Sequence, residues 1–385
     1  MKDIKKVFAW LHLWLGLAVG LIFSVVALTG AILVFEEELD PICYPSLYYL
    51  KQTNNDYQSS LSIDSLYSLA TQYAKGAKIN SLIVRDKSRH QAAVLFQTHG
   101  ERLTRHLLSV NPYTGQLQQD IKGSQHLFTF SEELHRQLLM GKTGKAITGI
   151  CCLSYLVILI TGLVLWWPKH KKNLRQRLKI KWDAKFKRLN WDLHAVAGFY
   201  SLPFVFLITF TGLTWSYKWF NEGIFFLFDG EGPQKEFVQG NEQLQSQGNI
   251  LQDIYRQTQS LLPYASNFTL YFPVEKTAAL RVSKEQSHAS IPNVVDQLFF
   301  DRNTGALIKK ELYNTRSKGM KVRRLIFPIH TGSLYGFPTK LLAFFCSLIG
   351  ASLPITGFII WLKRKKKKKP IKVNHLIRKD YELVN

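Results

Sequence analysis

Four of the eleven histidines recur at matching places in the two halves of the chain, which marks them as candidates for paired chemistry. They are His12, His135, His194 and His330. The first and third each precede a glycine by four residues, Gly16 and Gly198, and a Thr-Gly pair by 17 and 18. The second and fourth each precede a Thr-Gly pair by 26 and 27 residues. Because matching positions in an internal repeat are equivalent, the four histidines form two pairs.

A pair of imidazoles on facing helices is typical of low-spin haem b, whose flat macrocycle fits between the helices. We therefore predict two bis-His haems, one ligated by His12 with His194 and the other by His135 with His330. Gly16 and Gly198 leave room for a close approach near the first pair. A single histidine at a membrane interface is usually an anchor, but four in matching register favour ligation.

Other basic side chains are assigned by their place in the chain. Arg136 is the predicted cofactor-binding arginine, with Arg323 and Arg324 as further candidate partners for haem propionates. His126 is kept as an alternative outer ligand. The histidines without a counterpart are predicted to lie at the surface: His90, His99, His106, His126, His170, His288 and His375.

Four apolar blocks predict four transmembrane helices. Each has about the length, roughly 20 residues, that crosses a hydrocarbon core about 30 Å thick. The connection 168–190 holds ten Lys or Arg against one acid, and a run of lysines follows the last block. The positive-inside rule therefore predicts cytoplasmic termini in a bacterial inner membrane, with the two long segments between blocks outside.

Each outer segment predicts one helix followed by strands, with the turns NPYTG and DRNTG before the last strand. The expected fold is a mainly α membrane protein with two pseudo-symmetric repeats and two small α+β periplasmic domains. The predicted divisions are helix 7–35, domain 36–134, interfacial segment and helix 135–167, basic loop 168–190, helix 191–217, domain 218–329, interfacial segment and helix 330–362, and basic tail 363–385.

The formal charge of +23 is explained by topology and by contact with anionic lipid headgroups, so no nucleic-acid partner is expected. Three of the four cysteines fall inside apolar blocks, where they are typical small filler residues. The sequence has no glycine-rich nucleotide fingerprint, no Walker motif and no cysteine-based metal site. Direct use of a nicotinamide cofactor by this chain is therefore not expected.

The chain resembles the PepSY-associated transmembrane family, which includes iron-regulated inner-membrane proteins and ferric-siderophore reductases of the FoxB type. The resemblance is carried by HLWLGL, LHRQLLMGKTG, WDLHAVAGF and IHTGSLYG, and by VNPYTGQL and FDRNTGAL in the PepSY-like domains. It implies haem-dependent electron delivery to a ferric siderophore in the periplasm. Some relatives fuse a cytoplasmic flavin reductase domain, whereas only a short tail follows the last helix here. The implied electron donor is therefore a separate molecule, either a cytoplasmic reductase or a quinol.

Two other classes of function stay open at this stage. The first is a non-enzymatic accessory protein of iron uptake or peptidase regulation, whose PepSY-like domains bind a partner. The second is a transporter, which internal repeats favour. The absence of acidic residues from the helix cores counts against the transporter.

Overall fold

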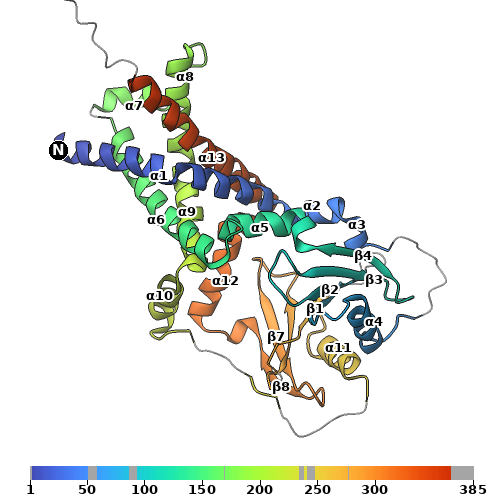
Figure 1. Cartoon of the computed structure of the whole chain (residues 1–385). Helices are drawn as coiled ribbons and strands as arrows, with labels where there is room; N and C mark the ends of the chain where they lie inside the picture. Colours follow the sequence, from blue (N-terminus) through green and yellow to red (C-terminus); the bar gives the residue numbers. More distant parts are fainter. Residues whose placement is uncertain are drawn as a thin grey trace, which may run out of the picture.

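The structure is a computed structural model that describes residues 2–50, 59–85, 93–168, 170–233, 238–240, 248–275 and 277–365. Long helices form a bundle at one end, and a sheet with its covering helices occupies the other (Figure 1). The bundle end with the N-terminus, α7 (Leu174–Arg177) and α8 (Phe186–Asp192) is called the basic end, and the opposite one the sheet end. His90, His375 and the tail beyond 365 lie outside the described residues.

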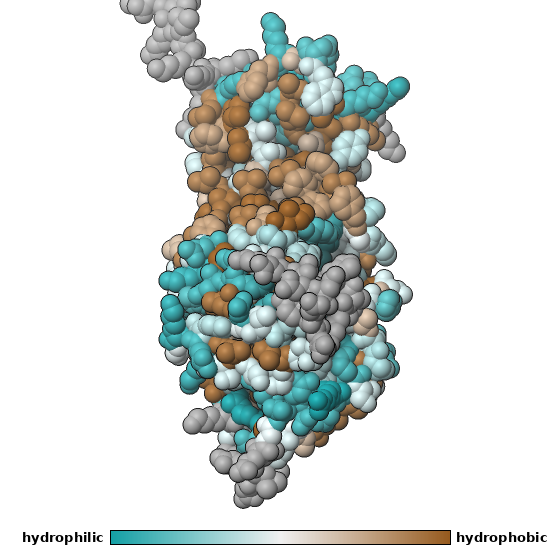
Figure 2. Space-filling view, turned by 90° about the vertical axis from the view of Figure 1, so that its right-hand side faces the viewer, coloured by the Kyte–Doolittle hydropathy of each residue, from teal (hydrophilic) through white to brown (hydrophobic). Residues whose placement is uncertain are grey.

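Four helices are long and apolar enough to cross a membrane, as predicted. The spans are Asp3–Val34 in α1 (Lys2–Val34), Gly141–Trp166 in α6, Phe186–Ser216 through α8 and α9 (Gly198–Ser216), and Phe337–Arg364 in α13 (Phe337–Lys365). Figure 2 shows apolar side chains in a band over this part of the molecule, between two more hydrophilic ends. Three of the helices begin several residues before their apolar blocks, because polar residues at an interface can continue a helix.

The bundle forms a ring in which α1 and α9 each pack against both α6 and α13. At its centre the rings of Phe23 and Tyr155 stack with centroids 3.3 Å apart. Val205 and Gly350 occupy the matching places in the second half of the chain. A Cβ atom added at Gly350 would lie 3.6 Å from Phe23 and 3.7 Å from Val205. The first half therefore fills the centre of the bundle with two large rings, and the second half has smaller residues at the matching places.

Each long segment between the spans contains helices, then four strands, then a further helix. The first holds α2 (Glu36–Cys43), α3 (Pro45–Tyr48), α4 (Ile63–Tyr73), β1 (Ile79–Val84), β2 (Val94–Thr98), β3 (His106–Val110), β4 (Leu117–Lys122) and α5 (Leu127–Gln137). The second holds α10 (Lys218–Asp229), α11 (Ile250–Leu261), β5 (Phe268–Tyr271), β6 (Leu280–Glu285), β7 (Val295–Phe300), β8 (Leu307–Glu311) and α12 (Lys318–Thr331).

The strands of both segments join in one eight-stranded antiparallel sheet, in the order β4-β3-β2-β1-β5-β6-β7-β8. The seam is the pairing of β1 with β5, in which Leu82 lies opposite Leu270. Both leucines are fully buried in a core that α4 and α11 cover from one face. The sequence predicted two α+β modules, and the structure adds that they share one sheet and one core.

The two predicted turns have the same construction. The side chain of Asn111 accepts hydrogen bonds from the backbone N–H groups of Tyr113 and Thr114, at 2.9 and 3.3 Å. Asp301 accepts from the corresponding pair in the second module, at 2.9 and 2.8 Å. Each turn ends on a glycine with φ near +70°, a conformation that favours glycine. These Asx turns explain the repeated N/D-x-x-T-G pattern.

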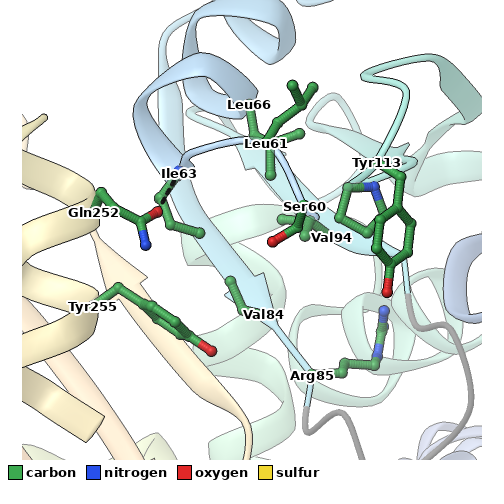
Figure 3. A pocket seen from close by; sticks show the side chains of 11 residues that line it. Ser60, Leu61, Ile63, Leu66, Val84, Arg85, Val94, Tyr113, Gln252 and Tyr255 are labelled. Atoms are coloured by element: carbon green, nitrogen blue, oxygen red, sulfur yellow. Dashed lines mark hydrogen bonds between the residues drawn. The ribbon is translucent and has the colours of Figure 1, made fainter. Parts of the chain in front are cut away.

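The two modules are also joined where α4 and α11 begin. Asp64 of α4 accepts hydrogen bonds from the backbone N–H groups of Leu251 and Gln252 at the start of α11. In return, the Gln252 side chain accepts from the N–H of Ile63 at 2.9 Å. Each helix thus satisfies free amide groups of the other. A small pocket of about 80 Å³ lies beside this junction (Figure 3).

Both α5 and α12 end just before a membrane span. In the first half, Leu138 and Leu139 have positive φ values of 49° and 59°, and α6 follows directly. This left-handed turn is costly for leucine and is held by surrounding contacts. In the second half, Gly332 and Gly336 take the positive φ values of the corresponding break. Both halves therefore have a left-handed break before the span, formed by two leucines and Gly141 (φ 55°) in the first half and by two glycines in the second.

Candidate functional site

The four repeated histidines form two pairs, as the repeat predicted. At the basic end, the ring centroids of His12 and His194 are 6.2 Å apart and the ring planes meet at 85°. At the sheet end, His135 and His330 have the same centroid distance of 6.2 Å and an interplanar angle of 67°. The histidines of each pair come from opposite halves of the chain, so neither half could form a pair alone.

At the basic end, each imidazole is held by a helix of its own half. His12 Nδ1 lies 3.0 Å from the backbone oxygen of Ile158 on α6. His194 Nδ1 lies 3.1 Å from the backbone oxygen of Leu353 on α13. A carbonyl oxygen can only accept a hydrogen bond, so Nδ1 carries the proton in both rings. The lone pair is then on Nε2, the atom that would bind a metal.

The sheet-end pair follows the same plan with different helices. His135 Nδ1 lies 2.8 Å from the backbone oxygen of Val26 on α1. His330 Nδ1 lies 2.9 Å from the backbone oxygen of Ile208 on α9. Each of these rings also carries its proton on Nδ1 and its lone pair on Nε2.

A threonine supports each hydrogen bond from the same helix as the carbonyl. Its hydroxyl donates to backbone oxygens one turn earlier, which leaves an oxygen lone pair facing the imidazole. The Nδ1 to Oγ1 distances are 3.3 Å for His12–Thr161, 2.9 Å for His194–Thr356, 3.3 Å for His135–Thr29 and 3.1 Å for His330–Thr211.

The glycine after each threonine gives the imidazole its space. A Cβ atom at that glycine would lie too close to Cε1 of the ring, at 3.0 Å for Gly30–His135, 3.0 Å for Gly162–His12, 3.2 Å for Gly357–His194 and 3.3 Å for Gly212–His330. The four Thr-Gly pairs are therefore functional positions whose role we did not predict. Their repetition at fixed intervals from the histidines was the available signal.

The geometry of each pair fits two axial ligands of one metal. A metal–imidazole nitrogen bond is about 2 Å long, and the nitrogen lies about 1.2 Å from the ring centre, so opposite ligands place ring centres about 6 Å apart. Among the described residues, no group of three or more His, Cys, Asp or Glu side chains could hold a metal ion. Two nitrogen ligands suit a metal whose macrocycle supplies the others.

A cavity of about 730 Å³ opens beside the basic-end pair. Both His12 and His194 line it, together with Gly16 and Gly198, the two predicted glycines. A Cβ atom at Gly16 would meet nothing within 4 Å, so this glycine faces open space. The volume lies within the range of about 300–1,000 Å³ that is usual for pockets of small organic ligands.

The backbone around the basic-end pair differs between the two halves. His12 lies within the regular helix α1, whereas His194 lies in a π-helical turn, Leu193–Ala197, between α8 and α9. Such turns occur mainly as single insertions at functional sites. The helix of the second half therefore begins with a π-helical turn that the first half lacks, but the two imidazole rings still lie 6.2 Å apart.

A match to the PepSY-associated TM region covers residues 9–364. The chain belongs to this family. Because the match includes all four spans and both sheet segments, it identifies a multi-pass membrane protein with PepSY-associated architecture. No curated protein matches the sequence.

The predicted arginines have partners within the protein. Arg136 donates to Glu132 on the same helix at 2.9 Å. Arg323 donates to Asn221 at 2.7 Å and lies over the ring of Trp215, while Arg324 contacts Asn293. These arginines are near the sheet-end pair in sequence, but other polar groups of the chain already occupy part of their hydrogen-bonding capacity.

One expectation about an individual side chain was wrong. His126 is not at the surface: it is 3 % exposed, and Asp40 and Thr129 bind its two ring nitrogens at 2.8 and 2.9 Å. It is therefore a structural residue instead of a reserve ligand. Lys340, at the start of α13, is paired within the protein: Glu37 and Glu38 each bind its ammonium group at 2.8 Å. Its charge is neutralised within the protein.

Acidic residues gather near the sheet end. Burial, followed by repulsion from Glu132 and Asp40, raises the pKa of Glu36 to about 7.

Burial lowers the pKa of His135, and burial with the nearby His135 lowers the pKa of His330 to about 4. Both imidazoles are therefore neutral at pH 7, which is the form that can bind a metal.

Proposed function

We propose that this chain is a haem-containing reductase that carries electrons from the basic end of its bundle to the sheet end, where it reduces a ferric chelate. The observation that carries the proposal is the double occurrence of one arrangement. Two histidines from opposite halves lie 6.2 Å apart, and a hydrogen bond to each Nδ1 leaves Nε2 as the available ligand atom.

The residues present fit haem b at each pair. Bound there, haem would supply a one-electron couple between ferric and ferrous iron, tuned by its axial ligands. The protein's part is to orient the imidazoles through the threonines and carbonyls, to leave room at the glycines, and to exclude water with the apolar helices. A hydrogen bond from Nδ1 makes the imidazole a stronger donor through Nε2, which favours ligation.

We further infer that the two halves are pseudo-symmetric repeats and that the basic end faces the cytoplasm of a bacterial cell. The connection 168–190 carries ten basic residues, and the positive-inside rule places such connections on the cytoplasmic side. The eight-stranded sheet would then be periplasmic. Electrons would enter at the cytoplasmic end from a separate donor, either a reductase or a quinol.

The sheet end is the better place for a large chelate. The region around α5, α12 and the sheet lies outside the spans, so a large chelate can approach it without entering the helix bundle. The exposed Lys142 and Lys145 at the start of α6 could attract an anionic chelate. Reduction adds one electron to each ferric ion, which lowers its charge and weakens its hold on hard oxygen ligands. Ferrous iron would thus be released.

The test uses the purified full chain in detergent, reduced beforehand and mixed anaerobically with a ferric siderophore. Haem reoxidation and capture of ferrous iron are followed together, and we expect one ferrous ion for each electron lost. Reoxidation without ferrous iron would indicate a different acceptor. If no ferric chelate reoxidises the protein, the accessory role in iron uptake or peptidase regulation becomes the better description.

The direction of transfer has its own test. A cysteine introduced at Tyr113 in the NPYTG turn should react with an impermeant thiol reagent in cells whose outer membrane alone has been opened. A cysteine at Lys179 in the basic connection should stay protected under the same conditions. The reverse pattern would invert the topology and the proposed direction of electron flow.

A further inference from the structure

The cavity beside His12 and His194 has charged side chains at one end only. Its walls are mostly glycine and apolar residues from the four spanning helices. Apart from the two histidines and Tyr155, the polar lining residues come from the basic connection or from helix ends beside it: Asn173, Gln176, Arg177, Arg188, Asp192 and Arg364. The cavity is therefore amphiphilic, with its apolar part between the helices and its polar part at the basic end.

Positions along the helices locate this polar group relative to the histidines. Arg364 follows Gly357, the glycine that contacts His194, by seven residues of α13. Arg188 precedes His194 by six residues. At about 1.5 Å per residue, both arginines lie about 10 Å from the histidine level, toward the basic end.

The charges at this mouth are mainly positive. Three arginines and one carboxylate line it, and that carboxylate, Asp192, is 4 % exposed and paired with Arg188 at 2.9 Å. Asp192 also accepts from the backbone N–H of Lys181, so it folds the connection back over the bundle. Asp192 is the one carboxylate among the lining residues, and it pairs with Arg188. No other lining carboxylate is available to Arg177 or Arg364.

Both arginines are held where they can act on a ligand. Arg177 donates to the backbone oxygen of Trp166 at the end of α6, and its other guanidinium N–H groups retain donor capacity. Arg364 lies over the ring of Trp191, with 5.7 Å from its guanidinium carbon to the ring centre. Arginine is well suited to bind carboxylates, because its planar guanidinium can donate two parallel hydrogen bonds.

We infer that Arg177 and Arg364 bind the two carboxylate arms of the haem at the basic-end pair, so the basic connection has a ligand-binding role as well as a topological one. The inference rests on the proposed function. It also fixes the orientation of the macrocycle, with its carboxylates toward the basic end and its apolar edge toward Tyr155, which lines the same cavity. Carboxylates placed the other way would be buried among apolar side chains at a high cost.

The experiment compares haem with its dimethyl ester, which has the same ring but no carboxylates. The full chain with His135→Ala serves as background, so that only the basic-end site is measured, and each porphyrin is titrated into haem-free protein. We expect haem to bind roughly tenfold more tightly than the ester. Arg177→Gln and Arg364→Gln should each reduce this preference several-fold by weakening haem and leaving the ester unchanged.

Arg175→Gln is the matched control, because Arg175 is an exposed arginine of the same helix, α7, that does not line the cavity. It should leave both affinities unchanged. Equal weakening of haem and ester by Arg177→Gln would show a structural role and overturn the inference. If the substitutions affect neither porphyrin, the inference is also overturned, and the arginines are better explained by contact with lipid headgroups. If the unmodified chain, with His135 in place, binds no haem, the proposed function itself is refuted.

Discussion

The two histidine pairs share one set of contacts but lie in different surroundings. In both, Nδ1 binds a carbonyl and a threonine hydroxyl on a neighbouring helix, and a glycine makes room for the ring. The basic-end pair lines a cavity with arginines at its mouth. The sheet-end pair lies near a group of carboxylates that includes Glu36 and Glu132.

The comparison shows that two features of each site have separate origins: the choice of ligand atom and the reduction potential of the bound metal. The repeated contacts decide which atom of each histidine can bind a metal. The surroundings change the reduction potential of that metal. Nearby cations favour its reduced state, whereas nearby carboxylates favour its oxidised state. Two sites with one ligand set can therefore have different potentials.

The largest expected effect comes from removing a ligand. His12→Ala or His194→Ala should remove the basic-end haem, and His135→Ala or His330→Ala the sheet-end haem, because a haem with one axial histidine is held weakly. Haem per polypeptide should fall from two to one in each variant. His106→Ala is the control, because the ring of His106 hydrogen-bonds to Asp120 on the sheet, away from both pairs. Retention of both haems by His12→Ala and His194→Ala would refute the basic-end assignment.

Gly16→Leu should affect only the basic end. A Cβ atom at Gly16 meets no other atom within 4 Å, and Gly16 lines the cavity, so a leucine there should leave the haem-free fold intact but fill part of the cavity. We expect haem content to fall toward one per chain with an unchanged unfolding temperature of the haem-free protein. Gly223→Leu, at another open position, should keep both haems. Two retained haems in Gly16→Leu would place the cofactor elsewhere.

The centre of the bundle provides a test of the unequal halves. Tyr155→Ala removes a buried ring that stacks on Phe23 and should cost about 3–5 kcal/mol. Gly350→Ala, at the matching place, adds a methyl group at ordinary contact distance and should stabilise the helix by up to about 1 kcal/mol. Thermal unfolding in detergent would measure both. Opposite signs are the expected outcome, and equal destabilisation would show that the room at Gly350 is required.

Glu36 should make the sheet end sensitive to pH. Its pKa is about 7 in the folded protein against an ordinary value of 4.5, so the folded state holds a proton that the unfolded state has lost between these values. Stability should therefore decrease as pH rises through this window. Glu36→Gln should remove this decrease and raise stability at pH 8 by roughly 2 kcal/mol.

Unfolding temperatures at pH 5 and pH 8 would measure the effect of Glu36. Glu101→Gln, at an exposed turn, is the control and should leave the pH dependence unchanged. An identical pH dependence in Glu36→Gln and the unmodified protein would assign the decrease to another group.

The smallest expected effect concerns the threonines. Thr356 Oγ1 lies 2.9 Å from His194 Nδ1, whereas Thr161 Oγ1 lies 3.3 Å from His12 Nδ1. Thr356→Val should therefore raise the reduction potential of the basic-end haem more than Thr161→Val, because a weaker hydrogen bond makes the imidazole a poorer donor. The change should be about 1 kcal/mol or less, since the carbonyl remains. Redox titration would measure it, and equal shifts would contradict the ranking.

Much of this architecture could be predicted from spacing and composition. Apolar blocks gave the four helices, because a hydrocarbon core fixes their length. The repeated N/D-x-x-T-G pattern gave the turns, and the equal intervals after His12 and His194 gave one pair. His126 was misassigned because nothing local signals its burial: its partner Asp40 is 86 residues away.

The sequence by itself determined which histidines are equivalent, since a repeat is visible in the intervals between residues. Only the tertiary structure decided that each ring is held by a carbonyl and a threonine of a neighbouring helix, that both modules share one sheet through β1 and β5, and that a cavity with an arginine mouth lies beside the basic-end pair. The physical reason is that these contacts join segments more than 100 residues apart. Local spacing shows which residues match, and packing between distant helices decides what each one contacts.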